Sequence, residues 1–151
     1  MLKYIAFSIG LLIAWLPCNA DDFSFRVRSL HKFTAQVDFV SQDRNAAWPG
    51  NDRAYPLDDD NVHTLTLRCR ANEKICFGAW DKAQAKPEWG VGNGHQLQCK
   101  NCCWFCEHNK QTPIITLHTR RTSSGVVPFF TIDTPAPPKP PKPAVILDDS
   151  Q

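Results

Sequence analysis

The chain has 151 residues, with 17 Lys and Arg against 15 Asp and Glu, and a net charge of +2 at neutral pH. So small a net charge produces no long-range field, and nucleic acid is not expected as a partner. The length suits one ordinary domain and is too short for two.

Residues 1–20 have the pattern of a secretory signal peptide. Lys3 precedes an apolar run over residues 4–16, and the segment ends in the small residue Ala20. This run is shorter than the ~20 residues that a membrane-spanning helix needs. We therefore expect cleavage after Ala20, a secreted or periplasmic location, and no stable membrane insertion.

Residues 21–133 form the expected folded domain. Apolar and polar residues alternate in several short segments, which is typical of strands with one buried face. No segment repeats apolar residues at helical spacing. We predict an all-β domain, a compact antiparallel β-sandwich or barrel-like fold of about six to eight short strands. The expected strands cover residues 23–30, 33–39, 64–69, 74–80, 114–119 and 126–132.

Two turns between the strands are expected to form hairpins. Asn72 and Glu73 separate two strand patterns and suit a two-residue turn. Asn93-Gly94 is a preferred centre for a tight hairpin turn. The glycine-rich residues 89–94 lack the GxGxxG spacing, so a hairpin is expected there in place of a phosphate loop.

The cysteines that follow the signal segment predict a framework of disulfides, because an even number in an exported chain is typical of paired thiols. Two arrangements remain open: Cys69 pairs with Cys76 across a hairpin, or one or both join the cluster at residues 99–106. A bond between adjacent cysteines is not expected. The six predicted disulfide cysteines are Cys69, Cys76, Cys99, Cys102, Cys103 and Cys106.

The cluster at residues 99–106 contains two CxxC motifs, a spacing that also serves zinc binding and thiol redox chemistry. His95 and His108 flank it and could complete a metal shell. A zinc-stabilised module is therefore an alternative, but its thiols would have to stay reduced after export. We expect structural disulfides and neither a metal nor another cofactor.

Two tryptophans border turns and are expected to be exposed, where they could bind a ligand. Trp48 and Trp89, with Asp43 and Arg44 from a neighbouring polar loop, are the predicted ligand-binding residues. The chain has no GxSxG or HExxH motif, and no catalytic residue is predicted. We expect a non-enzymatic binding module for an unknown protein or glycan; the rival is a hydrolytic enzyme whose site forms only in the fold. No pattern predicts the oligomeric state.

Residues 134–151 form a Pro- and Lys-rich tail that is expected to be disordered. Its prolines cannot donate backbone hydrogen bonds to a sheet. The tail carries the apolar residues 144–147 before Asp148 and Asp149. This apolar segment docks on a partner, folds back on its own domain or stays loose, as chain ends commonly do.

Five short segments carry a resemblance to known proteins: residues 41–45, 48–50, 73–80, 89–92 and 99–103. Together they resemble a group of small exported bacterial proteins that contain cysteines and have no characterised activity. The resemblance covers residues 23 to about 120 and implies a bacterial, periplasmic or extracellular setting. It implies no activity, cofactor or catalytic residue.

Overall fold

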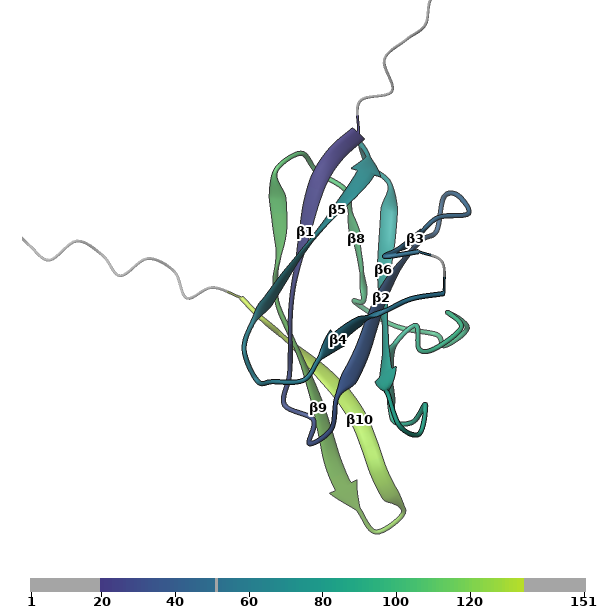
Figure 1. The fold of residues 1–151 in the computed structure, drawn as a ribbon, viewed down its shortest axis with the longest axis vertical. Helices are drawn as coiled ribbons and strands as arrows, with labels where there is room; N and C mark the ends of the chain where they lie inside the picture. The colour runs from purple at the N-terminus through teal and green to yellow at the C-terminus, as the bar shows by residue number, and fades with distance from the viewer. Residues whose placement is uncertain (1–19, 51, 135–151) are drawn as a thin grey trace, which may run out of the picture.

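The computed structural model describes residues 20–50 and 52–134, which form two β-sheets packed face to face (Figure 1). The predicted signal segment before Ala20 and the proline-rich tail after Thr134 lie outside the described residues. Each sheet has one apolar face, and burying these faces against each other produces the sandwich. The prediction of an all-β fold is confirmed.

The first sheet has the strand order β10-β9-β1-β5. β1 pairs antiparallel with β5 but parallel with β9. The prediction of a purely antiparallel domain is therefore wrong. The chain crosses to the second sheet between these strands, and so long a connection lets β9 return in the direction of β1. The bounds are β1 (Ala20–Ser29), β5 (His63–Arg70), β9 (Lys110–Thr122) and β10 (Gly125–Asp133).

The second sheet has the order β3-β2-β6-β7, with β4 beside β2 and β8 beside β6. Its bounds are β2 (Ala35–Ser41), β3 (Ala47–Trp48), β4 (Tyr55–Leu57), β6 (Lys74–Asp81), β7 (Glu88–Gly90) and β8 (Cys103–Phe105). The described residues thus contain ten strands, more than predicted. Strands of two or three residues are too short to show an alternating pattern. Among residues 20–50 and 52–134 no helix is long and apolar enough to cross a membrane.

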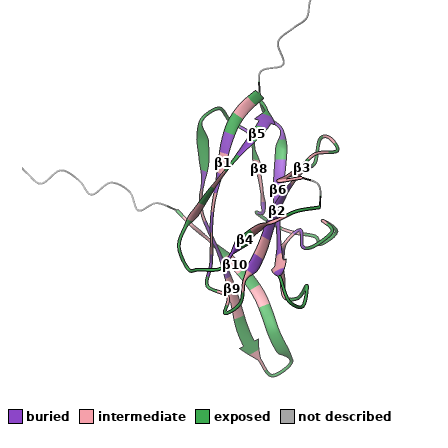
Figure 2. Ribbon diagram, in the orientation of Figure 1, coloured by how far each residue is buried: buried purple, intermediate pink, exposed green. Residues whose placement is uncertain are grey.

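The core lies between the sheets and is largely aromatic. Phe25, Phe39 and Phe77 are fully buried, and the ring centroids of Phe25 and Phe39 are 4.3 Å apart. Burial alternates along the central strands (Figure 2). One predicted core position is wrong: Phe33 is 54% exposed, because β2 begins only at Ala35. Each buried aromatic ring contributes about 1.5–3 kcal/mol.

β5 and β6 do not form the hairpin predicted at Asn72 and Glu73. The two strands lie in different sheets, so the turn carries the chain from one sheet to the other. The N–H of Glu73 donates to the carbonyl of Arg70 at 3.0 Å. The same turn residues occur in hairpins and in corners between two sheets. The sequence pattern therefore predicted a turn at the right place but the wrong pairing of the strands that flank it. Cys69 and Cys76 consequently do not face each other.

The hairpin predicted at Asn93-Gly94 is also wrong. After β7 the chain makes consecutive turns, and no strand follows before β8. The N–H of Gly92 donates to the carbonyl of Trp89, and the N–H of Leu97 donates to that of Val91, both at 3.0 Å. These bonds fold the segment back on itself and hold Leu97 beside β7.

β10 forms one edge of the first sheet. It pairs with β9, and no other strand of the described chain pairs with it. The β9–β10 hairpin extends beyond the rest of the sandwich at its turn (Figure 1). Pro128 lies in the middle of β10, and a proline within a sheet is found essentially only in an edge strand or at a bulge. The free edge of β10 therefore faces outward.

Candidate functional site

The four predicted ligand-binding residues lie at two separate places. Asp43 and Arg44 follow β2, and Trp48 ends β3, at one edge of the second sheet. Trp89 lies in β7 at the opposite edge. Because β2 and β6 lie between these edges, the four residues do not form one site.

A buried carboxylate holds Arg44. Its Nε and Nη2 donate to the two carboxylate oxygens of Glu73 at 2.6 and 3.2 Å, and the N–H of Arg70 donates to Glu73 at 2.8 Å. Burial by itself would raise the pKa of Glu73. Hydrogen bonds from Arg44, Ser41 and Arg70 outweigh burial and hold this pKa below its ordinary value. The ion pair thus fixes the loop after β2 to the turn between β5 and β6.

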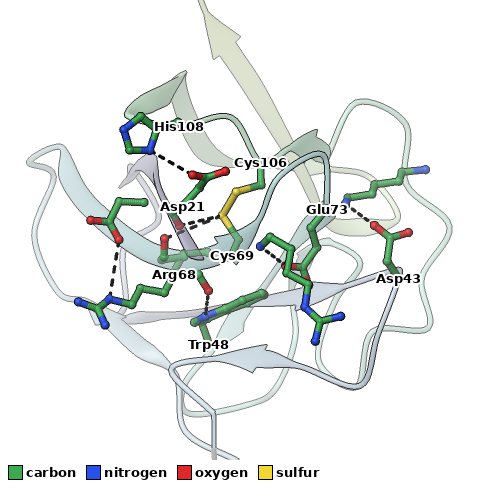
Figure 3. Close-up of a disulfide and its surroundings, with 12 residues drawn as sticks. Asp21, Asp43, Trp48, Arg68, Cys69, Glu73, Cys106 and His108 are labelled. Carbon is green, nitrogen blue, oxygen red and sulfur yellow. Dashed lines mark hydrogen bonds and ion pairs between the residues drawn. A yellow bond between two sulfur atoms is a disulfide. The ribbon is translucent and has the colours of Figure 1, made fainter. Parts of the chain in front are cut away.

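Asp43 and Trp48 also fix this region to the neighbouring strands (Figure 3). The Asp43 carboxylate accepts from the N–H of Lys74 at 2.6 Å, and the Trp48 indole donates to the carbonyl of Arg68 at 3.1 Å. The Arg44 guanidinium lies 5.5 Å from the centre of the Trp48 ring. These contacts use the polar atoms that a ligand would need, and the adjoining cavity has only about 150 Å³. Ligand binding by these residues stays a prediction.

All six predicted disulfide cysteines are paired. Of the two arrangements that the sequence left open, the structure has the one in which Cys69 and Cys76 both join the later cluster. The Cys69–Cys106 bond closes the longest loop of the three and is expected to contribute most to the stability of the fold, roughly 3–4 kcal/mol in the chain-entropy account. Three disulfides fit an oxidising, extracellular compartment. The pairs are Cys69–Cys106, Cys76–Cys103 and Cys99–Cys102, with sequence separations of 37, 27 and 3.

The two histidines that flank the cysteine cluster contact carboxylates. Nε2 of His95 lies 2.6 Å from Asp38, and Nδ1 of His108 lies 3.1 Å from Asp21. Within residues 20–50 and 52–134, no three His, Cys, Asp or Glu side chains are grouped to hold a metal ion. A zinc-stabilised cluster would need free thiolates, and all four cysteines of residues 99–106 are in disulfides.

We expect Cys69–Cys106 to be the last disulfide reduced under native conditions. Cys99 and Cys103, one cysteine of each other pair, are partly buried, whereas Cys69 and Cys106 are each 1% exposed, and a reductant must reach sulfur to react. Graded thiol reductant without denaturant, followed by alkylation and peptide mass spectrometry, will give the order. Simultaneous alkylation of Cys69 and Cys106 with Cys99 would contradict it.

Trp89 is buried, so the expectation that it is exposed is wrong. Its side chain is 2% exposed, and its indole N–H donates to the carbonyl of His118 at 2.7 Å. The ring packs edge-on against His31, with centroids 5.3 Å apart. β7 pairs with β6 opposite Ala79, and that pairing brings the ring inside the sandwich. No local pattern distinguishes this from an exposed loop.

His31 and Asp81 form a buried pair beside Trp89. Nε2 of His31 lies 2.8 Å from Asp81, and the two side chains are 7% and 3% exposed. Nδ1 of His31 lies 3.4 Å from the Thr119 hydroxyl. His31 also lines a cavity of about 470 Å³. The imidazole of His31 therefore lies between the Asp81 carboxylate and the Thr119 hydroxyl.

The pair of His95 and Asp38 holds the turns after β7 against the sheet. Burial is the main influence on Asp38 and raises the pKa of its carboxyl, although the hydrogen bond and charge of His95 oppose this. The other carboxylate oxygen, Oδ1, has no hydrogen-bond partner among the described residues. The pair therefore fixes the segment that precedes Leu97.

A groove of about 710 Å³ runs along β10. It opens where the two sheets end, because β10 is the last strand of the first sheet and β7 the last of the second. Residues 97–101 form part of the opposite wall. The residues that line the groove include Leu97, Cys99, Lys100, Pro128, Phe130 and Ile132. An adjoining hollow of about 430 Å³, near Lys86 and Val126, shares Leu97 and Pro128.

No protein-family model, curated protein or solved structure matches this chain. The resemblance to small exported bacterial proteins stays a prediction.

The register of β10 determines which of its backbone groups face the groove. In an antiparallel pair, every second residue directs its N–H and C=O groups away from the partner strand. Gly125 and Thr122 close the turn and form a hydrogen-bonded pair. Counting in twos from Gly125, Phe129 and Thr131 direct their N–H and C=O groups to β9, whereas Phe130 and Ile132 direct these groups to the free edge. The backbone of Pro128 also faces the free edge, so its missing N–H removes no hydrogen bond to β9. Within the described chain, Phe130 and Ile132 have no backbone partner on that side.

The groove has a mixed lining, in which apolar side chains lie beside polar and charged ones. Leu97 is 45% exposed and Val126 52% exposed, while Phe130 packs edge-on against buried Phe77 at a centroid distance of 5.1 Å. Lys86 and Lys100 are exposed at the rim. The groove thus offers backbone hydrogen bonds, apolar contact and positive charge together.

The sequence pattern predicts β10 as a strand, but it does not predict the groove beside this strand. Strand order is set by contacts far apart in the sequence, so no local pattern shows that β10 is an edge. One signal was present: Pro128 stands inside an apolar strand pattern, and a proline there demotes the strand to an edge.

Proposed function

We propose that this protein is an exported, non-enzymatic binding module that takes up an extended polypeptide segment along β10. The observation that carries the proposal is an unpaired strand edge beside an apolar groove. Strand addition of this kind draws affinity from main-chain hydrogen bonds and specificity from alternate side chains. The disulfides support a secreted or periplasmic setting, because they need an oxidising compartment.

The disulfide nearest the groove supports a preformed site. Cys99–Cys102 closes part of the wall that carries Leu97 and Lys100. A wall that is ordered before binding lowers the entropy lost when the ligand docks. Residues 97–101 therefore suit a binding site better than a free loop would.

The alternative hypothesis is a hydrolytic enzyme, and the residues that support it best are His31 and Asp81. His31 lines a cavity and lies within hydrogen-bond reach of Asp81. The pair is closed in by Trp89, however, and its two side chains are only 7% and 3% exposed. The groove along β10 presents a strand edge that has no partner strand within the described chain, and for this reason we favour the binding module.

Amide hydrogen exchange with a bound peptide tests strand addition directly. Panning a library of random peptides on the oxidised protein should enrich extended sequences with alternating apolar residues. Their binding should slow exchange at the amides of Phe130 and Ile132, which face the free edge. The amides of Phe129 and Thr131 already donate to β9 and should not change. Enriched peptides that leave all four amides unchanged would refute the site.

A pair of variants adds a matched control. Leu97→Asp places a charge in the groove wall and should weaken peptide binding about tenfold or more. Phe105→Asp alters another exposed apolar residue, 59% exposed in β8 and outside the groove, and should leave binding unchanged. Equal losses in both variants would remove the groove from consideration.

A further inference from the structure

We propose that the segment added to β10 is residues 144–149 of a second copy of this chain. The inference rests on the proposed strand-addition site and names its occupant. Residues 144–147 are Ala-Val-Ile-Leu, followed by Asp148 and Asp149. Each molecule would then offer both a receiving edge and an inserting segment, a head-to-tail contact that builds chains or closed rings.

The reach of the tail favours a second copy over the same molecule. The tail follows β10, whose last residue is Asp133. Six of the nine residues 135–143 are proline, and a polyproline stretch of that length spans about 28 Å. Phe130 and Ile132 lie within about 10 Å of the end of β10. A stiff spacer would carry residues 144–147 beyond their own strand edge and toward that of a neighbour.

The inserting segment matches the groove in side-chain chemistry. Val145 and Ile146 are β-branched, which favours an extended strand. Alternate residues of a strand face the same side, so Val145 and Leu147 would share one face if this segment docks as a strand. Leu97 and Pro128 supply an apolar surface on which such a pair can pack. Covering the edge of β10 also removes a site that would otherwise pair without specificity.

Charge adds to the match. Lys86 lines the hollow that contains Val126, Lys100 lines the groove, and both lysines are exposed. Glu88 lines both hollows, and its carboxylate accepts a hydrogen bond from the N–H of Asn93 at 2.9 Å. Asp148 and Asp149 follow the apolar residues directly. An acidic pair docked beside either lysine gains a complementary charge, which favours encounter and register.

The first test is the association of the full exported chain. Sedimentation velocity over rising concentrations should show an increasing average mass. The double variant Val145→Asp, Ile146→Asp should weaken the association about tenfold or more, because the segment loses its apolar contact. Lys139→Ala, Lys142→Ala changes the tail but not the segment and serves as the matched control. It should associate as the unaltered chain does.

The melting temperature in dilute solution separates the second copy from the same molecule. It should be the same for the unaltered chain and for Val145→Asp, Ile146→Asp, because no tail is docked at low concentration. A lower melting temperature for the variant would mean that the tail packs on its own domain, and would overturn the proposal.

The second test uses a synthetic peptide of residues 143–151 and the full chain carrying Val145→Asp and Ile146→Asp as receiver. The peptide should bind and slow amide exchange at Phe130 and Ile132. Adding Lys86→Glu and Lys100→Glu to the receiver should weaken binding. A peptide with Asp148→Lys and Asp149→Lys should restore it, because the charges are then exchanged.

The outcomes separate this inference from the proposed function. A chain that stays monomeric, together with a tail peptide that protects neither edge amide, would overturn the inference. If library peptides still protect Phe130 and Ile132 in that case, strand addition stands with a different occupant. If no peptide protects them, both proposals fail.

Discussion

Gly90→Ala is expected to destabilise the fold by about 3 kcal/mol or more. Gly90 has φ +62°, a conformation that side chains disfavour. A Cβ atom there would overlap the carbonyl oxygen of Phe77 and lie 2.9 Å from its ring carbon Cε2. Phe77 is fully buried between the sheets, so neither contact can be relieved by a surface shift. Urea denaturation at neutral pH will measure the loss.

Gly94→Ala is the matched control. Gly94 also has a positive φ, +87°, but a Cβ atom there would meet nothing within 4 Å. The variant should therefore show only the backbone cost, about 1 kcal/mol. If both variants lose the same stability, the close contact with Phe77 is not the cause. Because Gly90 lines the groove, its variant should also bind library peptides more weakly, whereas Gly94→Ala should not.

Glu73→Gln is expected to cost about 2–3 kcal/mol at neutral pH. The carboxylate is 3% exposed and accepts hydrogen bonds from the Arg44 guanidinium and the Arg70 N–H. An amide of the same shape loses the charge and replaces one acceptor oxygen with a donor. Arg44 then keeps its charge without a full partner. A double-mutant cycle with Arg44→Met should show that most of the loss belongs to this pair.

The stability difference between the unaltered chain and Glu73→Gln should depend on pH. The pKa of Glu73 is lowered in the folded state, so the unfolded chain takes up the proton at higher pH. The carboxylate therefore stabilises the fold fully above its unfolded pKa of about 4.3. This stabilisation is lost as the pH falls through the lower folded value. Urea titrations in steps from neutral to acid pH should show the two curves converging.

Asp59 provides the comparison for this pH effect. Hydrogen bonds from Asn61 and His63 also lower the pKa of Asp59, but the group is exposed to solvent. Solvent screening should therefore make Asp59→Asn the smaller change at every pH. A loss in Asp59→Asn as large as that in Glu73→Gln would show that burial of Glu73 does not determine the effect.

Several features of this protein could be read from its sequence. The strands predicted at residues 64–69 and 74–80 correspond to β5 and β6. Burial alternates along β5, because covering one sheet face imposes a period of two on the chain, whereas β6 is buried on both faces. The six cysteines predicted disulfides, because an exported chain with an even number of cysteines pairs them. Both signals are local or compositional and need no knowledge of the fold.

Other features were decided only when strands distant in sequence came together. The parallel pairing of β1 with β9 depends on residues about ninety positions apart. Trp89 is buried because β7 pairs with β6 and turns its ring toward His31. The corner at Asn72 separates Cys69 from Cys76, although a hairpin with the same turn residues would have paired them.

In the candidate site, too, some features follow from the sequence and others only from the tertiary structure. By itself, the sequence determined that residues 126–132 form an apolar strand with a proline inside it, and that a proline-rich tail carries apolar residues 144–147. Only the tertiary structure decided that this strand is an edge and that Leu97 and Lys100 face it across a groove. Strand order depends on which faces bury the most apolar surface together, and that sum over distant residues has no local signature.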